Sequence, residues 1–287
     1  MRHPEGLPAP LRALDRTLVM GILNVTPDSF SDGGLWSDAD RAIARGLGLR
    51  QEGADVVDVG GESTRPGADR VPVSEELDRV LPVVTGLVAA HVPVSIDTMR
   101  AEVAAACVDA GACLVNDVSG GGADPEMGPW VASSTVPYVV MHWRGPSRVM
   151  SQLATYDDVV GEVSAELRAR VDALASLGVD PGRLILDPGL GFAKESDHNW
   201  QLLGRLDALQ DLGFPLLIGA SRKRFLGDLL ADDSGPRPLD ARDAAGDAVS
   251  ALAAAAGAWA VRVHEVAASR DAVAVGRAWR AASGESA

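Results

Sequence analysis

The strongest constraint on the fold is a repeat of short apolar runs, each followed by a segment of helical length. We count eight such runs along the 287 residues. This alternation is typical of βα units, which build a parallel sheet. The predicted strands are residues 18–25, 56–61, 92–97, 113–117, 138–142, 184–187, 216–219 and 260–264.

The segments between the runs are predicted to be helices. Asp38 and Asp157 stand where a capping side chain could accept the free amide protons of a first turn, and glycines follow several expected helix ends. The predicted helices are residues 39–52, 74–90, 100–110, 125–133, 157–177, 198–212, 242–256 and 268–281. Eight successive units favour closure into a (β/α)8 barrel.

The alternative architecture is an open doubly wound sheet that binds a dinucleotide. That fold carries a glycine fingerprint after an early strand, and the pair Gly189 and Gly191 lacks the third glycine. No change in composition marks a second domain. We therefore predict an α/β protein with a single-domain TIM barrel over residues 17–287, preceded by a flexible N-terminal leader over residues 1–16.

The charge balance restricts the partners. Asp and Glu total 40 against 26 Lys and Arg, a formal charge of -14, which argues against a surface for nucleic acid or anionic lipid. The first 16 residues lack the apolar core of a secretory signal. The longest apolar run, residues 251–261, is shorter than the roughly 20 residues of a membrane span. We expect a cytoplasmic protein with no nucleic-acid or membrane partner.

Polar residues gather where the predicted strands end, which is where barrel enzymes place their catalytic groups. A polar side chain facing a barrel interior needs a partner or a ligand. Taken singly, Asp117 or His142 is better interpreted as a structural residue that caps the next helix. Taken together, the set indicates a ligand site: Asn24, Asp97, Asn116, Asp117, His142, Asp187, Arg262 and His264.

Two subsites are expected within this set. Arg262 and His264 lie two apart on one strand, so both face the same side, next to Asn24 on the first strand, and this arrangement suits an anion.

The second subsite consists of two carboxylates and an amide, which suit the edge of an amidine-containing heterocycle. These groups belong to Asp97, Asn116 and Asp187. Lys223, one of only two lysines in the chain, could complete the subsite. The residues alone therefore predict a pocket for a polar ring, with a phosphate near Arg262.

The segment 20–34 (MGILNVTPDSFSDGG) closely resembles the first signature of the dihydropteroate synthases. Further segments resemble that family in the same order, so the resemblance covers the chain from the first predicted strand to the last. They are 58–67 (DVGGESTRPG), 95–98 (SIDT), 116–117 (ND), 187–192 (DPGLGF), 221–223 (SRK) and 262–264 (RVH).

The resemblance implies a TIM barrel that condenses 6-hydroxymethyl-7,8-dihydropterin diphosphate with 4-aminobenzoate. The products are 7,8-dihydropteroate and pyrophosphate, in folate synthesis. The implied partners also include Mg²⁺ and a second copy of the chain, which docks through the last helices. The dissociative, SN1-like route of the family needs no dedicated general base.

The resemblance also implies a role for each matching residue. The pterin would be held by Asp97, Asn116, Asp187 and Lys223. The diphosphate would be held by Arg262 and His264, with Asn24 as the metal ligand. The aminobenzoate would be bordered by Phe192, Lys223 and Arg224. Lys223 would act in catalysis together with the loop residues that close over the site, namely Phe30, Asp32, Thr64 and Arg65, with Pro66 beside them.

Two departures and two alternatives accompany this interpretation. Glu265 stands where many members have Asp, and Gly246-Asp247 stands where members often have Gly-Thr or small residues. One alternative is a paralogue that binds a pterin without catalysis. The other is a corrinoid-linked methyltransferase domain that acts on methyltetrahydrofolate, which would not need the first two loop signatures or the pair Arg262 and His264.

Overall fold

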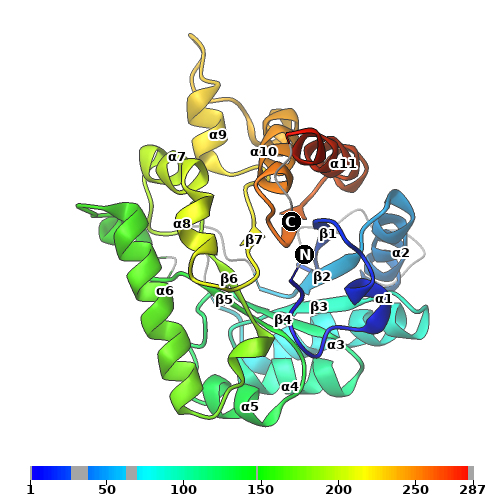
Figure 1. The fold of residues 1–287 in the computed structure, drawn as a ribbon. Coiled ribbons are helices and arrows are strands. Elements are labelled where there is room, and N and C mark those ends of the chain that lie inside the picture. Colours follow the sequence, from blue (N-terminus) through cyan, green and yellow to red (C-terminus); the bar gives the residue numbers. More distant parts are fainter. Residues whose placement is uncertain (1, 27–37, 63–69, 147, 284–287) are drawn as a thin grey trace.

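The fold is a closed parallel barrel surrounded by helices (Figure 1). A computed structural model describes residues 2–26, 38–62, 70–146 and 148–283. The strands follow the order β6-β5-β4-β3-β2-β1-β8-β7, and a parallel bridge between Leu186 and Leu216 joins the two ends of that order. This arrangement confirms the predicted TIM barrel, formed as a single domain.

The strands are short and parallel throughout. They are β1 (Leu18–Asn24), β2 (Val56–Gly60), β3 (Val94–Asp97), β4 (Leu114–Asp117), β5 (Tyr138–Met141), β6 (Leu184–Asp187), β7 (Leu217–Ile218) and β8 (Ala260–Val263). Each lies within a predicted run. The register pairs Gly60 with Asp97 and Asp97 with Asn116, so the carboxyl ends of neighbouring strands lie level.

The helices surround the barrel, except the first, which lies across one end of it. They are α1 (Ala9–Arg12), α2 (Asp38–Glu52), α3 (Val73–Ala89), α4 (Ala101–Asp109), α5 (Met127–Ser133), α6 (Val159–Ser176), α7 (Ser196–Gly204), α8 (Leu206–Gln210), α9 (Arg224–Leu229), α10 (Asp243–Ala255) and α11 (Val266–Ala282).

The helices differ from the predictions at several points, and α1 and α9 were not predicted. The helix expected over residues 198–212 is divided into α7 and α8 at Arg205, whose φ of -130° is not helical. The break follows Gly204, a residue that weakens a helix interior. Helix α6 is capped by Asp158, which accepts from the backbone N–H of Gly161 at 3.1 Å, so the expected cap at Asp157 is wrong by one residue.

The residues predicted to be a flexible N-terminal leader pack against the barrel in this structure, and their flexibility stays a prediction. Within the described residues 2–16, Leu7 and Leu11 are each 3% exposed, and they pack in one apolar cluster with Leu18, Met20 and Trp259. Figure 1 shows this segment, in blue, lying across one end of the barrel. The physical reason is that the amino-terminal end of the barrel exposes apolar side chains that need a cover.

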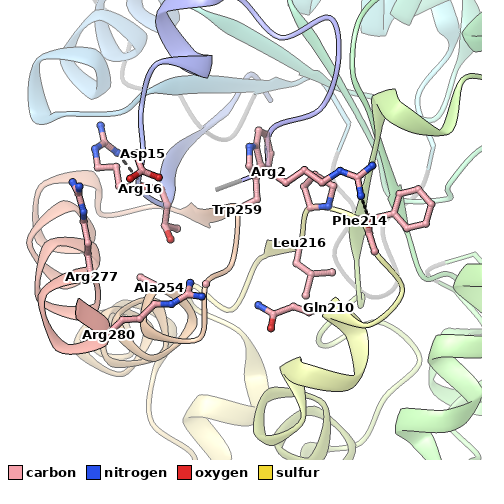
Figure 2. A pocket seen from close by; sticks show the side chains of 14 residues that line it. Arg2, Asp15, Arg16, Gln210, Phe214, Leu216, Ala254, Trp259, Arg277 and Arg280 are labelled. Atoms are coloured by element: carbon pink, nitrogen blue, oxygen red, sulfur yellow. Dashed lines mark hydrogen bonds between the residues drawn. The ribbon is translucent and has the colours of Figure 1, made fainter. Parts of the chain in front are cut away.

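A cavity of about 350 Å³ remains at this end (Figure 2). Its lining includes Thr17, Leu216 and Trp259, which lie at or just before the starts of strands β1, β7 and β8. The cavity is therefore opposite to the carboxyl ends where the site residues lie. Among the described residues, no helix is both long and apolar enough to cross a membrane.

Candidate active site

The candidate site is the polar layer directly above the apolar floor of the barrel. The floor includes Val56, Leu114, Ile185 and Ala260, all buried in one cluster. Side chains two positions further along a strand face the same way. The corresponding residues are Asp58 on β2, Asn116 on β4, Asp187 on β6 and Arg262 on β8. The alternation along each strand therefore brings polar groups from strands across the barrel into one layer.

Arg262 lies at the centre of the strongest cluster in this layer. Its Nε donates to Asp58 Oδ2 at 2.6 Å, and its Nη2 donates to Asp97 Oδ2 at 2.7 Å. Asn116 Nδ2 donates to the same Asp58 oxygen at 3.0 Å. Burial raises the pKa of Asp97 to about 7, although the guanidinium of Arg262 opposes the rise. The carboxyl of Asp97 is therefore close to the balance between its charged and neutral forms at neutral pH.

Asp187, Lys223 and Arg262 meet around Gly219. A β-carbon placed on Gly219 would lie 3.8 Å from Cβ of Arg262, 3.9 Å from Nζ of Lys223 and 4.0 Å from Oδ2 of Asp187. Burial lowers the pKa of Lys223 to about 8, with Asp187 opposing the fall. Residues predicted from distant segments thus border one space, and the absence of a side chain at Gly219 keeps that space open.

The residues expected to bind an anion have different partners in this structure. Arg262 contacts carboxylates, whereas His264 lies at the rim with its Nδ1 2.9 Å from Ser221 Oγ. Asn24 is the last residue of β1 and is half-buried. Among the described residues, no group of three or more His, Cys, Asp or Glu side chains could hold a metal ion.

Two of the three residues expected to border the aminobenzoate, Phe192 and Lys223, lie close together. Nζ of Lys223 lies 4.8 Å from the centre of the Phe192 ring and donates to the backbone carbonyl of Leu190. Arg224, at the start of α9, has a side chain that is 88% exposed. The predicted loop residues Phe30, Asp32, Thr64, Arg65 and Pro66 lie outside the described residues.

Asp117 has the structural role that its position suggested. Its carboxylate accepts from the hydroxyl of Tyr138 at 2.6 Å, from the backbone and hydroxyl of Ser119 at 2.7 Å, and from the backbone of Gly121 at 2.8 Å. These donors satisfy the carboxylate without a ligand, and they fix the loop after β4.

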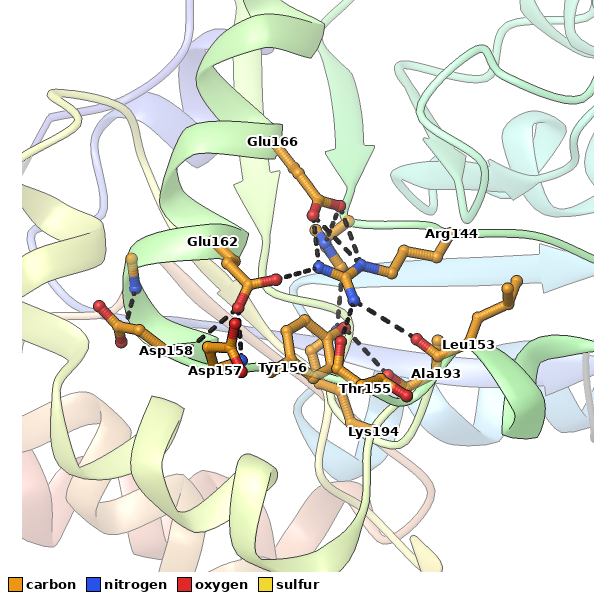
Figure 3. A network of polar contacts seen from close by, with 12 residues as sticks. Arg144, Leu153, Thr155, Tyr156, Asp157, Asp158, Glu162, Glu166, Ala193 and Lys194 are labelled. Atoms are coloured by element: carbon orange, nitrogen blue, oxygen red, sulfur yellow. Dashed lines mark hydrogen bonds and ion pairs between the residues drawn. The ribbon is translucent and has the colours of Figure 1, made fainter.

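A polar network behind the site includes Arg144, Glu166 and Lys194 (Figure 3), and it also contains His142, the residue that follows β5. Nε2 of His142 lies 2.9 Å from Glu166 Oε2, and Nδ1 lies 2.9 Å from Nζ of Lys194, which also donates to the Phe192 carbonyl at 3.1 Å. Burial lowers the pKa of His142 to about 4. A neutral imidazole therefore donates to Glu166, accepts from Lys194, and so anchors the loop that carries Phe192.

Lys194 should give the protein a distinct pH dependence of stability. Burial lowers the pKa of Lys194 from 10.5 to about 7, with Asp187 opposing the fall. Between these values the unfolded chain binds more protons than the folded one, so stability rises with pH in this window. We expect Lys194→Met to remove about 1–3 kcal/mol of the rise between pH 7 and 9. Urea unfolding of both proteins at the two pH values measures it, with Arg45→Met as control. Equal slopes in wild type and Lys194→Met would contradict the assignment.

The two departures from the family pattern have visible contacts. Glu265 accepts from Nη2 of Arg222 at 2.6 Å, and Arg222 also bonds Asp243 at 2.8 Å, so Glu265 helps hold the loop that carries Lys223. Asp247 accepts from the hydroxyl of Ser269 at 2.7 Å, a contact between α10 and α11. Both departures therefore act on local packing around the site.

The sequence analysis missed two elements of the site. Asp58 is 0% exposed and bonds both Arg262 and Asn116, yet it was not among the predicted site residues. Its signal was a carboxylate in the middle of a buried apolar strand, a position that requires a partner. The other is the connection of Lys194 to His142, which no spacing along the chain indicates.

Comparisons with known proteins identify the family of the chain. The family model described as pterin binding enzyme matches residues 20–264. The chain belongs to this family of pterin-binding enzymes. It is 56% identical over 263 residues to the dihydropteroate synthase of Mycobacterium leprae, which covers 91% of this chain and 93% of that protein. Within the pterin-binding family, the chain belongs to the dihydropteroate synthases.

Solved structures show the same fold. The Xanthomonas albilineans dihydropteroate synthase with 4-aminobenzoic acid aligns with a TM-score of 0.85 at 48% identity, covering 92% of this chain and 93% of that one. The Yersinia pestis dihydropteroate synthase in a sulfonamide drug complex aligns with a TM-score of 0.87 at 38% identity, covering 97% and 98%.

Proposed function

We propose that the protein condenses 6-hydroxymethyl-7,8-dihydropterin diphosphate with 4-aminobenzoate, giving 7,8-dihydropteroate and pyrophosphate. The observation that carries this proposal is the meeting of Asp187, Lys223 and Arg262 around Gly219, within the layer that also holds Asp97 and Asn116. Relatives that bind 4-aminobenzoic acid or a sulfonamide support the second substrate. The cytoplasmic location expected from the sequence stays a prediction.

The interior layer has the chemistry that a pterin requires. Carboxylates and an amide can pair with the donors and acceptors of an amidine edge. Asp58 Oδ1 and Ser95 Oγ are buried and have no hydrogen-bond partner among the described residues. Because buried polar atoms are rarely left unpaired, these two support a polar ligand or bound water in this layer.

The leaving group would be stabilised at the rim. Departure of diphosphate from the pterin methylene builds positive charge on the ring and negative charge on the diphosphate, so carboxylates near the ring and cations near the diphosphate favour both. Arg262 would exchange its carboxylate partners for this anion, and His264 would bind beside it. We assign no general base, because a carbocation accepts even a weakly basic arylamine.

The donor set at Asn24 fits Mg²⁺ bound mainly by substrate. Mg²⁺ commonly keeps several waters and takes one or two protein oxygens together with substrate phosphates, so a dedicated cluster of carboxylates is not required. Asn24 would supply one amide oxygen at the end of β1. When bound, the ion would neutralise charge that develops on the leaving diphosphate.

The decisive experiment measures pyrophosphate release from the pterin diphosphate on addition of 4-aminobenzoate. We expect release that depends on both substrates and that sulfonamides inhibit in competition with 4-aminobenzoate. A folded protein that binds the pterin but releases nothing would instead be a non-catalytic paralogue. Methyl transfer from methyltetrahydrofolate to a corrinoid would favour the remaining alternative.

The dissociative route makes a separate prediction. In the absence of 4-aminobenzoate, reversible cleavage should scramble an isotope label between the bridging and non-bridging oxygens of bound pterin diphosphate. Mass spectrometry or ³¹P NMR of the recovered substrate would detect the exchange. Bond cleavage that depends strictly on the amine would argue for direct displacement.

A homodimer through the last helices is part of this proposal. Leu252 on α10 is 70% exposed, and Val275 and Trp279 on α11 are 62% and 74% exposed, so two neighbouring helices present large apolar side chains to solvent. We expect the wild type to sediment as a dimer and Trp279→Glu as a monomer. Leu177→Glu, at an exposed leucine after α6, should leave the dimer intact. A monomeric wild type would remove this interface.

A further inference from the structure

The cavity at the amino-terminal end of the barrel combines a basic wall with an apolar wall. Figure 2 shows Arg277 and Arg280 rising from α11 on one side, and Gln210 and Phe214 from the segment around α8 on the other. Leu216 and Trp259 contribute further apolar surface. The cavity of about 350 Å³ is large enough for a small organic molecule.

Positive charge is concentrated here although the chain has a formal charge of -14. The lining contains Arg2, Arg16, Arg277 and Arg280 but only one acidic residue, Asp15. Arg16 is neutralised by Asp55, to which it donates two hydrogen bonds of 2.7 Å. Even with these two carboxylates nearby, arginine charge is in excess, and a concave site with such an excess attracts anions.

Arg280 provides an independent indication of a ligand. Its Nε is buried and has no hydrogen-bond partner among the described residues. Its guanidinium lies against Gly257, where a β-carbon would come within 2.1 Å of Nη1, so the absence of a side chain at Gly257 makes room for it. A partly desolvated guanidinium without a matched acceptor is costly, and an anion would satisfy it.

We propose that this cavity binds a small aromatic carboxylate. The carboxylate accepts hydrogen bonds from the guanidinium group of Arg280, whose planar geometry matches it, and Arg277 adds positive charge at the edge of the cavity. The ring packs against the wall that Phe214 and Leu216 form. The charged part of the ligand therefore lies at the basic wall and its apolar part at the apolar wall. This site is separate from the proposed catalytic layer, which lies at the opposite end of the strands.

The cavity is also distinct from the proposed dimer surface. Arg277 and Arg280 line the cavity, whereas Val275 and Trp279 on the same helix are 62% and 74% exposed. Positions 275 and 279 share one face of an α-helix, and position 277 lies about 200° around the axis from 275. Variants at the arginines therefore test ligand binding without altering the apolar dimer face.

The test uses 2-naphthoate, whose binding to the full chain is measured by saturation-transfer NMR and titration calorimetry. We expect the wild type to bind it, and Arg277→Gln/Arg280→Gln to weaken the affinity by at least about tenfold, or about 1.4 kcal/mol. Arg41→Gln/Arg45→Gln, which changes two arginines on α2, is the matched control and should bind as the wild type does. Lys223→Ala should also retain binding, because it alters only the catalytic end.

Three results would overturn the proposal. The first is no binding by the wild type. The second is equal affinity of the cavity variant and the wild type. The third is loss of binding in Lys223→Ala with retention in the cavity variant, which would place the naphthoate in the amine subsite. Thermal melting of each variant checks folding, and the single change Arg280→Gln repeats the test if the double variant is unstable.

Discussion

Replacement of Lys223 by alanine is expected to lower kcat/KM for pyrophosphate release by about 10²–10³-fold, the usual effect of removing a positioned charged donor. Nζ of Lys223 lies beside Asp187 and 4.8 Å from the centre of the Phe192 ring, so it borders both proposed substrates. Its loss also removes the cation that opposes the burial-induced rise in the pKa of Asp187. More of Asp187 would then be protonated, and it would accept hydrogen bonds from the pterin more weakly.

The matched control is Lys194→Ala, which removes the other lysine. Lys194 contacts His142 and the Phe192 carbonyl behind the site, so we expect a loss of less than about tenfold, mostly in KM for 4-aminobenzoate. The Lys223→Ala defect should shrink as pH rises, because a higher pH returns Asp187 to its charged form. Equal losses in the two variants would remove Lys223 from the catalytic role.

The second large effect is expected on stability. Arg262→Met leaves Asp58 and Asp97 buried without their guanidinium, and breaking a buried ion pair on one side costs about 3–5 kcal/mol. The loss should depend on pH. With a pKa of about 7 in the folded wild type and 3.8 as its ordinary value, Asp97 favours folding at low pH and loses that contribution as pH rises.

Removing Arg262 moves the pKa of Asp97 higher still, because the guanidinium opposes the rise. The deficit of the variant should therefore be smaller at pH 5 than near pH 9, while the lost contact with Asp58 contributes at both values. Urea unfolding at both values measures the difference. Arg205→Met, whose arginine pairs with an exposed Asp207, should change stability by less than about 0.5 kcal/mol at either pH. A deficit for Arg262→Met that is the same at both pH values would contradict the role given to Asp97.

Much of the site could be predicted because it follows the strands. A parallel barrel sends every strand end to one rim, so Asp97, Asn116 and Asp187 could be placed together from their positions in the apolar runs. The inward alternation that selects them is a property of each strand alone. The same rule applies to Asp58, which lies two positions after Val56 and faces the same way. The sequence analysis treated Asp58 only as part of the segment 58–67 that resembles the family, and so did not place it in the layer.

Other features depend on contacts between segments distant along the chain. The partners of Arg262 are one example. Its position on a strand predicted an anion site, but could not predict its ion pairs with Asp58 and Asp97, which lie more than 160 residues earlier. Arg280 and Gly257 likewise become neighbours only when α11 packs against the end of α10. No local spacing indicates which of several nearby carboxylates a long side chain will reach.

The amino-acid sequence by itself determined the barrel, the rim that carries the chemistry and the family. The spacing of apolar residues, the turn residues and the signature segments are local properties, so they can be recognised without knowing any tertiary contact. Tertiary structure alone decided that residues 2–16 close the barrel, that Lys194 reaches His142 and that a basic cavity forms at the far end. These features follow from burial and charge pairing, which depend on the distances that folding creates.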